Sequence, residues 1–178
     1  MMFIKHITTV LTVVTLALGS PLERRSTGET VIADLSAVST DFSEIKLAMQ
    51  LFNGSIASAA RVPVAVTSLK GHLKATLNDT HNSGVFSPSE SMTITKAWSG
   101  LTSSYSESLH DAVAKKAQFV KLNMGDAMVD NFHVVTDYTD AISRQLKKKV
   151  AVLDTPTIDM ATAQMDGALN AAVQAYTT

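Results

Sequence analysis

The fold is decided by the stretch from Val31 to Phe52, which reads VIADLSAVSTDFSEIKLAMQLF. Its apolar residues recur in alternating steps of four and three, at Val31, Leu35, Val38, Phe42, Ile45, Met49 and Phe52. This spacing places all of them on one stripe of an α-helix, while polar residues between them, such as Asp34 and Asp41, can face water. Such a helix needs partners that bury its stripe, and these must come from the rest of the chain.

Four further segments show the same helical spacing. We expect helices over residues 58–77, 87–120, 126–150 and 157–176, separated by short connections and by a loop over 78–86 that is rich in Asn, Asp, His, Ser and Gly. The clearest start is Ser87, because Pro88 and Glu90 follow it as in a capping box. Pro63 either lies in the first turn of its helix or kinks it. The predicted fold class is therefore all-α, an up-and-down bundle of about five long amphipathic helices.

The N-terminus is predicted to be a targeting segment outside this bundle. Residues 1–19 combine Lys5 with an apolar run that is too short to span a bilayer and with a small-residue cleavage motif, which is typical of a secretory signal peptide. Residues 20–25 end in the pair Arg24-Arg25, which either ends a short pro-segment or remains as an uncut linker. Residues 26–178 then form a single domain that we expect to be secreted.

Composition limits how this domain is stabilised and what it binds. The chain has no cysteine, so its stability must come from an apolar core without disulfides. Fifteen Lys plus Arg balance sixteen Asp plus Glu, which argues against nucleic acid as a partner. No apolar tail follows Tyr176, so we expect no lipid-anchor signal.

No catalytic or metal-binding pattern stands out. His110 and Asp111 are adjacent, and adjacent helical residues point about 100° apart, so they do not form a dyad. Asp126 and Asp130 lie one turn apart and could share a cation, but a solvated helix face explains them more simply. Residues 147–149 are three lysines, which either contact anionic polymers or complement the helix dipole. We therefore expect no enzyme activity, no metal and no cofactor.

The apolar stripes leave two interpretations open. They either fill a plain core, or they enclose an elongated apolar cavity, which the interrupting glycines Gly71, Gly100 and Gly167 and the methionines near the stripes would favour. If a cavity exists, its predicted lining is Val38, Phe42, Ile45, Met49, Leu69, Leu73, Leu101, Tyr105, Leu109, Phe132, Val135, Ile142, Met165 and Leu169. Asn53 and Asn78 begin glycosylation sequons at predicted helix ends.

Four segments give the chain a resemblance to a known family. They are Val31-Ile32-Ala33-Asp34-Leu35, Ala112-Val113-Ala114-Lys115-Lys116-Ala117-Gln118-Phe119, Tyr138-Thr139-Asp140-Ala141-Ile142 and Ala171-Ala172-Val173-Gln174-Ala175-Tyr176. In this order, behind a signal peptide and a short pro-segment, they resemble the fungal hydrophobic-surface-binding protein and cell-wall mannoprotein family. The resemblance implies a secreted helical bundle that binds hydrophobic surfaces, with esterase recruitment in some members and fatty-acid binding in a central cavity in others. Some members carry a Ser/Thr-rich tail with a lipid anchor, which we do not expect here.

These observations predict a secreted, non-enzymatic protein that binds hydrophobic surfaces, fatty-acid-like lipids or both through its apolar helix faces. The expected partners are a fatty acid, a hydrophobic solid surface and, as the resemblance implies, a secreted esterase or cell-wall polysaccharide. The alternative is a structural cell-wall glycoprotein or antigen without a small ligand. A helical enzyme inhibitor is disfavoured because such inhibitors carry paired cysteines.

Overall fold

The computed structural model describes residues 27–178. The predicted signal peptide and pro-segment fall on residues 1–26, outside the described residues. The helices are α1 (Gly28–Leu51), α2 (Ile56–Ala59), α3 (Arg61–Asn82), α4 (Pro88–Ala114), α5 (Lys116–Lys121), α6 (Gly125–Lys147), the 3₁₀ helix η1 (Val152–Asp154) and α7 (Thr155–Thr177). Five of these are long, as the apolar spacing predicts, and the all-α fold class is confirmed.

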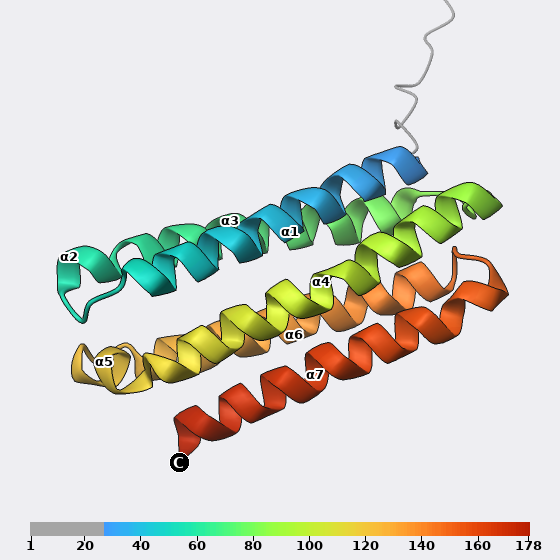
Figure 1. The fold of residues 1–178 in the computed structure, drawn as a ribbon. Coiled ribbons are helices and arrows are strands. Elements are labelled where there is room, and N and C mark those ends of the chain that lie inside the picture. The colour runs from blue at the N-terminus through green and yellow to red at the C-terminus, as the bar shows by residue number, and fades with distance from the viewer. Residues whose placement is uncertain (1–26) are drawn as a thin grey trace, which may run out of the picture.

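The five long helices form a closed ring. α1 packs against α3 and α4, α7 packs against α4 and α6, and α3 and α6 close the ring. Figure 1 shows α1 and α3 at the top, α4 in front of α6 below them, and α7 at the bottom. Consecutive long helices run in opposite directions, as in an up-and-down bundle. Because every helix presents its stripe inward, the axis of the ring is occupied by side chains alone.

The helix starts follow the capping residues in the sequence. At α1, the Thr27 hydroxyl accepts a hydrogen bond from the backbone N–H of Thr30. At α4, the Ser87 side chain and the Glu90 carboxylate form the predicted capping box, with the Ser87 backbone N–H donating to Glu90 Oε2 at 2.8 Å. Pro63 lies in the first turn of α3, where its missing N–H removes no helical hydrogen bond. Pro63 therefore lies at the start of the helix and does not kink it.

The predicted loop over residues 78–86 is wrong in its first half, because α3 continues to Asn82. Thr76 and Thr80 are fully buried and extend the apolar stripe of α3 beyond Leu73. The Thr76 hydroxyl donates to the carbonyl of His72 one turn earlier, which lets a polar residue occupy an inward position. Polar composition suggested a loop, but both threonines face the core, and within residues 27–178 the Thr80 hydroxyl has no hydrogen-bond partner.

The expected helix over 87–120 is also wrong at its end, because it breaks at Lys115 into α4 and α5. The break turns Phe119 inward, where it is fully buried and stacks on Phe52 with 4.4 Å between ring centroids. The Lys115 ammonium donates to the carbonyl of Phe52 at 2.9 Å, which satisfies an acceptor at the end of α1. The short helices α2 and α5 thus close one end of the ring.

The three-lysine run lies where α6 ends and the chain turns. α6 stops at Lys147, three residues before the predicted end at Val150. Lys147 pairs with Asp159 of α7 at 2.7 Å, and the Lys149 ammonium donates to the carbonyls of His81 and Ser83. Two of the three charges therefore tie neighbouring segments together.

The predicted stripe of α1 is buried along its whole length, but its polar side is not uniformly exposed. Asp41, expected to face water, is 5% exposed. It accepts a hydrogen bond from the Ser68 hydroxyl at 2.8 Å and pairs with His72 Nδ1 at 2.5 Å, both on α3. A buried carboxylate is tolerated here because both of its oxygens have partners.

Asp34 and Asp79 form a second polar contact across the α1–α3 seam. Burial, followed by the hydrogen bond with Asp79 and the charge of Asp79, raises the pKa of Asp34 to about 6, against an opposing effect of His72. The ordinary pKa of an aspartate in an unfolded chain is about 4. The folded chain therefore holds this proton more tightly, so the contribution of Asp34 to stability is complete below about pH 4 and is lost as the pH rises through about 6.

Asp34→Asn is expected to remove this pH dependence. It should raise the free energy of unfolding at neutral pH by about 1 kcal/mol, a value discounted for partial exposure of the carboxyl group. Urea unfolding at about pH 4 and about pH 7 measures the effect. Asp130→Asn removes the same charge from an exposed position on α6 and serves as the control. An unchanged fall in stability between the two pH values in Asp34→Asn would contradict the assignment.

Candidate functional site

A small apolar cavity lies on the axis of the ring and is lined by all five long helices. Its volume is about 40 Å³. The lining residues are Phe42, Ile45 and Met49 of α1, Val66 and Leu69 of α3, Tyr105, Ser108, Leu109 and Ala112 of α4, Met128, Asn131, Phe132 and Val135 of α6, and Leu169 of α7. A central apolar cavity, which the sequence left open, is therefore present.

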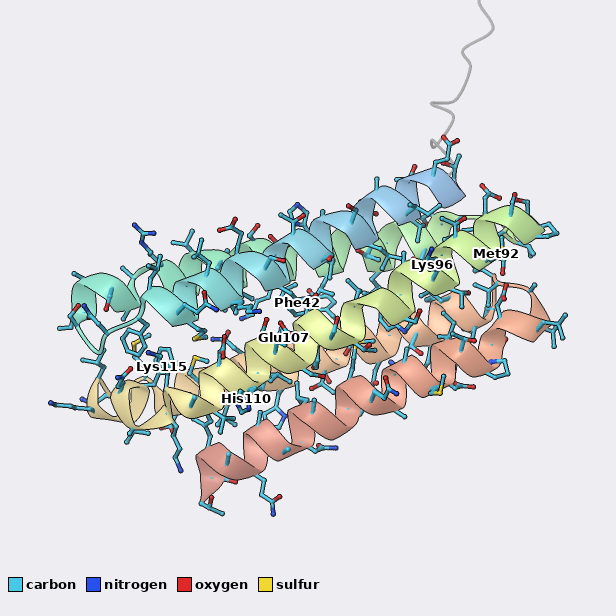
Figure 2. All side chains as sticks on the ribbon, viewed as in Figure 1. Phe42, Met92, Lys96, Glu107, His110 and Lys115 are labelled. Atoms are coloured by element: carbon cyan, nitrogen blue, oxygen red, sulfur yellow. The ribbon has the colours of Figure 1, made fainter. Side chains whose placement is uncertain are left out.

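The helical spacing explains why these residues meet. Phe42, Ile45 and Met49 are consecutive members of the α1 stripe, and the corresponding stripes of the neighbouring α4 and of α6 across the axis complete the wall. Phe42 extends from α1 toward α4 (Figure 2) and makes an edge-to-face contact with Tyr105 at 5.2 Å between ring centroids. The cavity lies nearer to the end of the bundle that α2 and α5 close.

Nine predicted lining residues do line the cavity, namely Phe42, Ile45, Met49, Leu69, Tyr105, Leu109, Phe132, Val135 and Leu169. The other five, Val38, Leu73, Leu101, Ile142 and Met165, are buried but do not reach it. They lie on the same stripes one or two turns farther along the axis, outside the cavity. The stripe pattern thus identified inward positions, but it did not distinguish a filled layer from a hollow one.

Five lining residues are absent from the predicted set: Val66, Ser108, Ala112, Met128 and Asn131. Val66, Ala112 and Met128 lie on the predicted stripes and could have been included. Ser108 and Asn131 are polar, so a search for apolar spacing passes over them. The Ser108 hydroxyl donates to the carbonyls of Phe42 and Ser104, at 3.0 and 2.7 Å, and this satisfies it inside an apolar wall.

The interrupting glycines do not create the cavity. A Cβ added at Gly71, Gly100 or Gly167 would meet no atom within 4 Å, because all three lie on the outer surface of the bundle. Among the methionines, Met92 is 65% exposed at the outer end of α4 (Figure 2), whereas Met49 and Met128 line the cavity. Small residues on the outside and flexible methionines inside leave the cavity wall adaptable.

One buried and one half-buried tyrosine, Tyr105 and Tyr176, border the site. Burial raises the pKa of Tyr105 well above its ordinary value, and the charges of Asp166 and Asp140 add to this rise. Burial also raises the pKa of Tyr176 to about 12. The Tyr176 hydroxyl donates to the carbonyl of Ala112 at 2.8 Å, and its ring contacts Phe132 edge-to-face. Both tyrosines therefore stay neutral at physiological pH; Tyr176 joins α7 to α4 and α6, and Tyr105 joins α4 to Phe42 of α1.

The cavity is smaller than a ligand pocket, since pockets for drug-sized ligands measure about 300 to 1,000 Å³. At about 40 Å³ it has room for only a few atoms. A lipid chain therefore requires the helices or the lining side chains to move apart. No disulfide opposes such a movement, because the chain contains no cysteine.

Other candidate chemistry is not brought together. Among residues 27–178, no three His, Cys, Asp or Glu side chains are grouped so that they could hold a metal ion. Asp126 and Asp130 are both exposed on α6, as a solvated helix face would have them. Asn53 is exposed in the turn after α1, whereas Asn78 is exposed within α3 and not at its end, so the expected position of the second sequon is wrong. Glycosylation at both stays a prediction.

A ring of long helices around a small apolar cavity defines the class of protein, an all-α bundle with an apolar axis. The chain belongs to the hydrophobic surface binding protein A family, whose pattern matches residues 28–148. This confirms the resemblance seen in the sequence. Within the part of the chain that the structure describes, no helix has the length and apolarity needed to cross a membrane.

Solved structures share the fold. AFMP4P in complex with palmitic acid superposes with a TM-score of 0.82 at 25% sequence identity, covering 84% of this chain and 99% of that one. Ligand binding domain 1 of Penicillium marneffei MP1 protein, complexed with arachidonic acids, gives 0.77 at 13% identity, covering 84% and 98%. Ligand binding domain 2 of the same protein, with multiple arachidonic acids, gives 0.70 at 14% identity, covering 83% and 92%. A comparison with curated protein sequences finds no significant match.

Proposed function

We propose that this chain is a secreted, non-enzymatic protein that takes the alkyl chain of a fatty acid into its axial cavity. The observation that carries the proposal is the apolar cavity to which all five long helices contribute. Family membership and the similarity to AFMP4P, which was crystallised with palmitic acid, support the same ligand class. Binding would be driven by burial of the alkyl chain, at about 25 cal/mol per Å² of apolar surface.

Adsorption to hydrophobic solids is the second part of this proposal. Leu47, Leu51 and Val64 are 46%, 48% and 71% exposed and line one groove between α1 and α3, of about 480 Å³. This groove offers apolar contact to a surface without any opening of the ring. Glycosylation at the exposed Asn53 and Asn78 is proposed from their sequons, and cell-wall association and recruitment of a secreted esterase are proposed from the family resemblance.

The test is native mass spectrometry and thermal unfolding with palmitic acid. We expect one or more bound acids per chain and, at a free concentration about 100 times Kd, a stabilisation of about 2.7 kcal/mol, or a rise in Tm of about 5–10 °C. Adsorption to polystyrene beads is measured in parallel with Leu47, Leu51 and Val64 replaced by serine. A protein that takes up no palmitic acid overturns the cavity proposal, and unchanged adsorption of the serine variant overturns the surface proposal.

A further inference from the structure

Asn131 is an unusual residue in the wall of the cavity. It lies on α6 between Met128 and Val135, one turn from each, and the residues around it in the wall are apolar. Its Oδ1 accepts a hydrogen bond from the Lys70 ammonium of α3 at 2.5 Å. Within residues 27–178, its Nδ2 group donates to no acceptor, so two N–H bonds remain available at the α3–α6 seam, beside a cavity whose own surface is apolar.

Among the described lysines that reach across seams between helices, Lys70 is the one whose partner is a side-chain amide. Lys46 pairs with the carboxylate of Glu107, and the ammonium groups of Lys115 and Lys116 donate to the carbonyls of Phe52 and Ala175. In the described part of the chain, Lys70 forms no ion pair and its only hydrogen-bond partner is the neutral amide of Asn131. It is half-buried and directly follows Leu69, which lines the cavity. A positive charge without a carboxylate partner is thus held next to Asn131, a residue that lines the cavity, although Lys70 itself does not line it.

Ser108, the other polar residue in the cavity wall, cannot donate a hydrogen bond to a ligand. The single proton of the Ser108 hydroxyl already serves the carbonyls of Phe42 and Ser104. Ser108 therefore has no proton left for an anion. Amide and ammonium N–H groups, in contrast, donate charge-assisted hydrogen bonds to carboxylate oxygens. At the α3–α6 seam, both kinds of donor lie together at the edge of an apolar space.

We propose that Lys70 and Asn131 bind the carboxylate head group of the fatty acid. This inference rests on the proposed function and adds the class of head group. The Lys70 ammonium and the Asn131 Nδ2 group donate to the carboxylate oxygens, while the alkyl chain passes from the α3–α6 seam into the axial cavity. The site therefore selects free acids over neutral lipids of the same chain length.

The test compares palmitic acid with its methyl ester, which has the same chain but no negative charge. We expect the wild-type protein to bind the acid about tenfold more tightly than the ester, since hydrogen bonds to a charged group are stronger than those to a neutral one. Lys70→Met and Asn131→Leu should each remove most of this preference, so that acid and ester bind with similar affinity. Lys70→Arg retains the charge and should retain the preference.

Lys74→Met is the matched control, because Lys74 is exposed one turn farther along α3. It should bind both ligands as the wild-type protein does. Circular dichroism confirms that each variant is folded before its affinities are compared. Equal binding of acid and ester by the wild-type protein, or an unchanged preference in both Lys70→Met and Asn131→Leu, overturns the head-group site and leaves the cavity proposal intact. A wild-type protein that binds neither ligand overturns both.

Discussion

Trp98→Ala is expected to lower the free energy of unfolding by about 3–5 kcal/mol, the range for removing a large aromatic side chain from a core. Trp98 is fully buried on α4, and its indole N–H donates to the Thr162 hydroxyl of α7 at 3.3 Å. Domains of this size are stable by about 5–15 kcal/mol, so the loss is a large share of the total. No disulfide compensates for it, because the chain contains no cysteine.

Urea unfolding followed by circular dichroism measures this effect, since the variant lacks the only tryptophan. Trp98→Phe is the control, because it retains much of the apolar volume and loses only the indole donor. Thr162 keeps its hydrogen bond to Ser143, so no buried donor is left unpaired. A loss below about 1 kcal/mol in Trp98→Ala would show that the two helices repack around the missing side chain.

Val135→Phe is expected to lower the affinity for palmitic acid by about tenfold or more, because the added ring occupies the space that the alkyl chain requires. Val135 is 8% exposed and faces the cavity from α6. The larger side chain enters a space of about 40 Å³ that already exists. We therefore expect a stability cost at the low end of the usual overpacking range of about 1–3 kcal/mol.

Ile158→Val is the control for Val135→Phe, because it lowers stability without filling the cavity. Ile158 is fully buried near the start of α7 and does not line the cavity. Its shortening costs about 0.5–1.5 kcal/mol and should leave the affinity for palmitic acid unchanged. Isothermal titration calorimetry on both variants measures the contrast. If Val135→Phe binds palmitic acid like the wild-type protein, the alkyl chain lies elsewhere on the molecule.

The arrangement of five helices in a ring explains why the site lies on the axis. Each long helix contacts two others, and no helix occupies the centre. The space inside is therefore filled only by side chains, and its volume depends on their size at each level. At the level of Val38, Leu101 and Met165 the side chains fill it, whereas at the level of Phe42, Leu109 and Leu169 they do not. A small change in the ring is then sufficient to enlarge an existing cavity.

Much of the fold could be predicted because its signals are local. The stripe of α1, the capping box at Ser87 and the first-turn position of Pro63 depend on residues within a few positions of one another. The errors arose where a distant contact decided the outcome. α3 continues beyond Leu77 because Thr80 is buried by neighbouring helices, and α4 breaks at Lys115 because Phe119 packs on Phe52.

The candidate site, like the fold, could be predicted from the sequence only in part. The heptad spacing of Val31 to Phe52 and of the later helices determined by itself that the chain forms an all-α bundle and which residues point inward, since helical periodicity is a property of the local chain. Only the tertiary structure decided that the bundle is a ring with one hollow level, because the volume left on the axis depends on side chains from five helices at once. It also decided that Lys70 and Asn131 meet at 2.5 Å across the α3–α6 seam, since no spacing in the sequence relates two residues on separate helices.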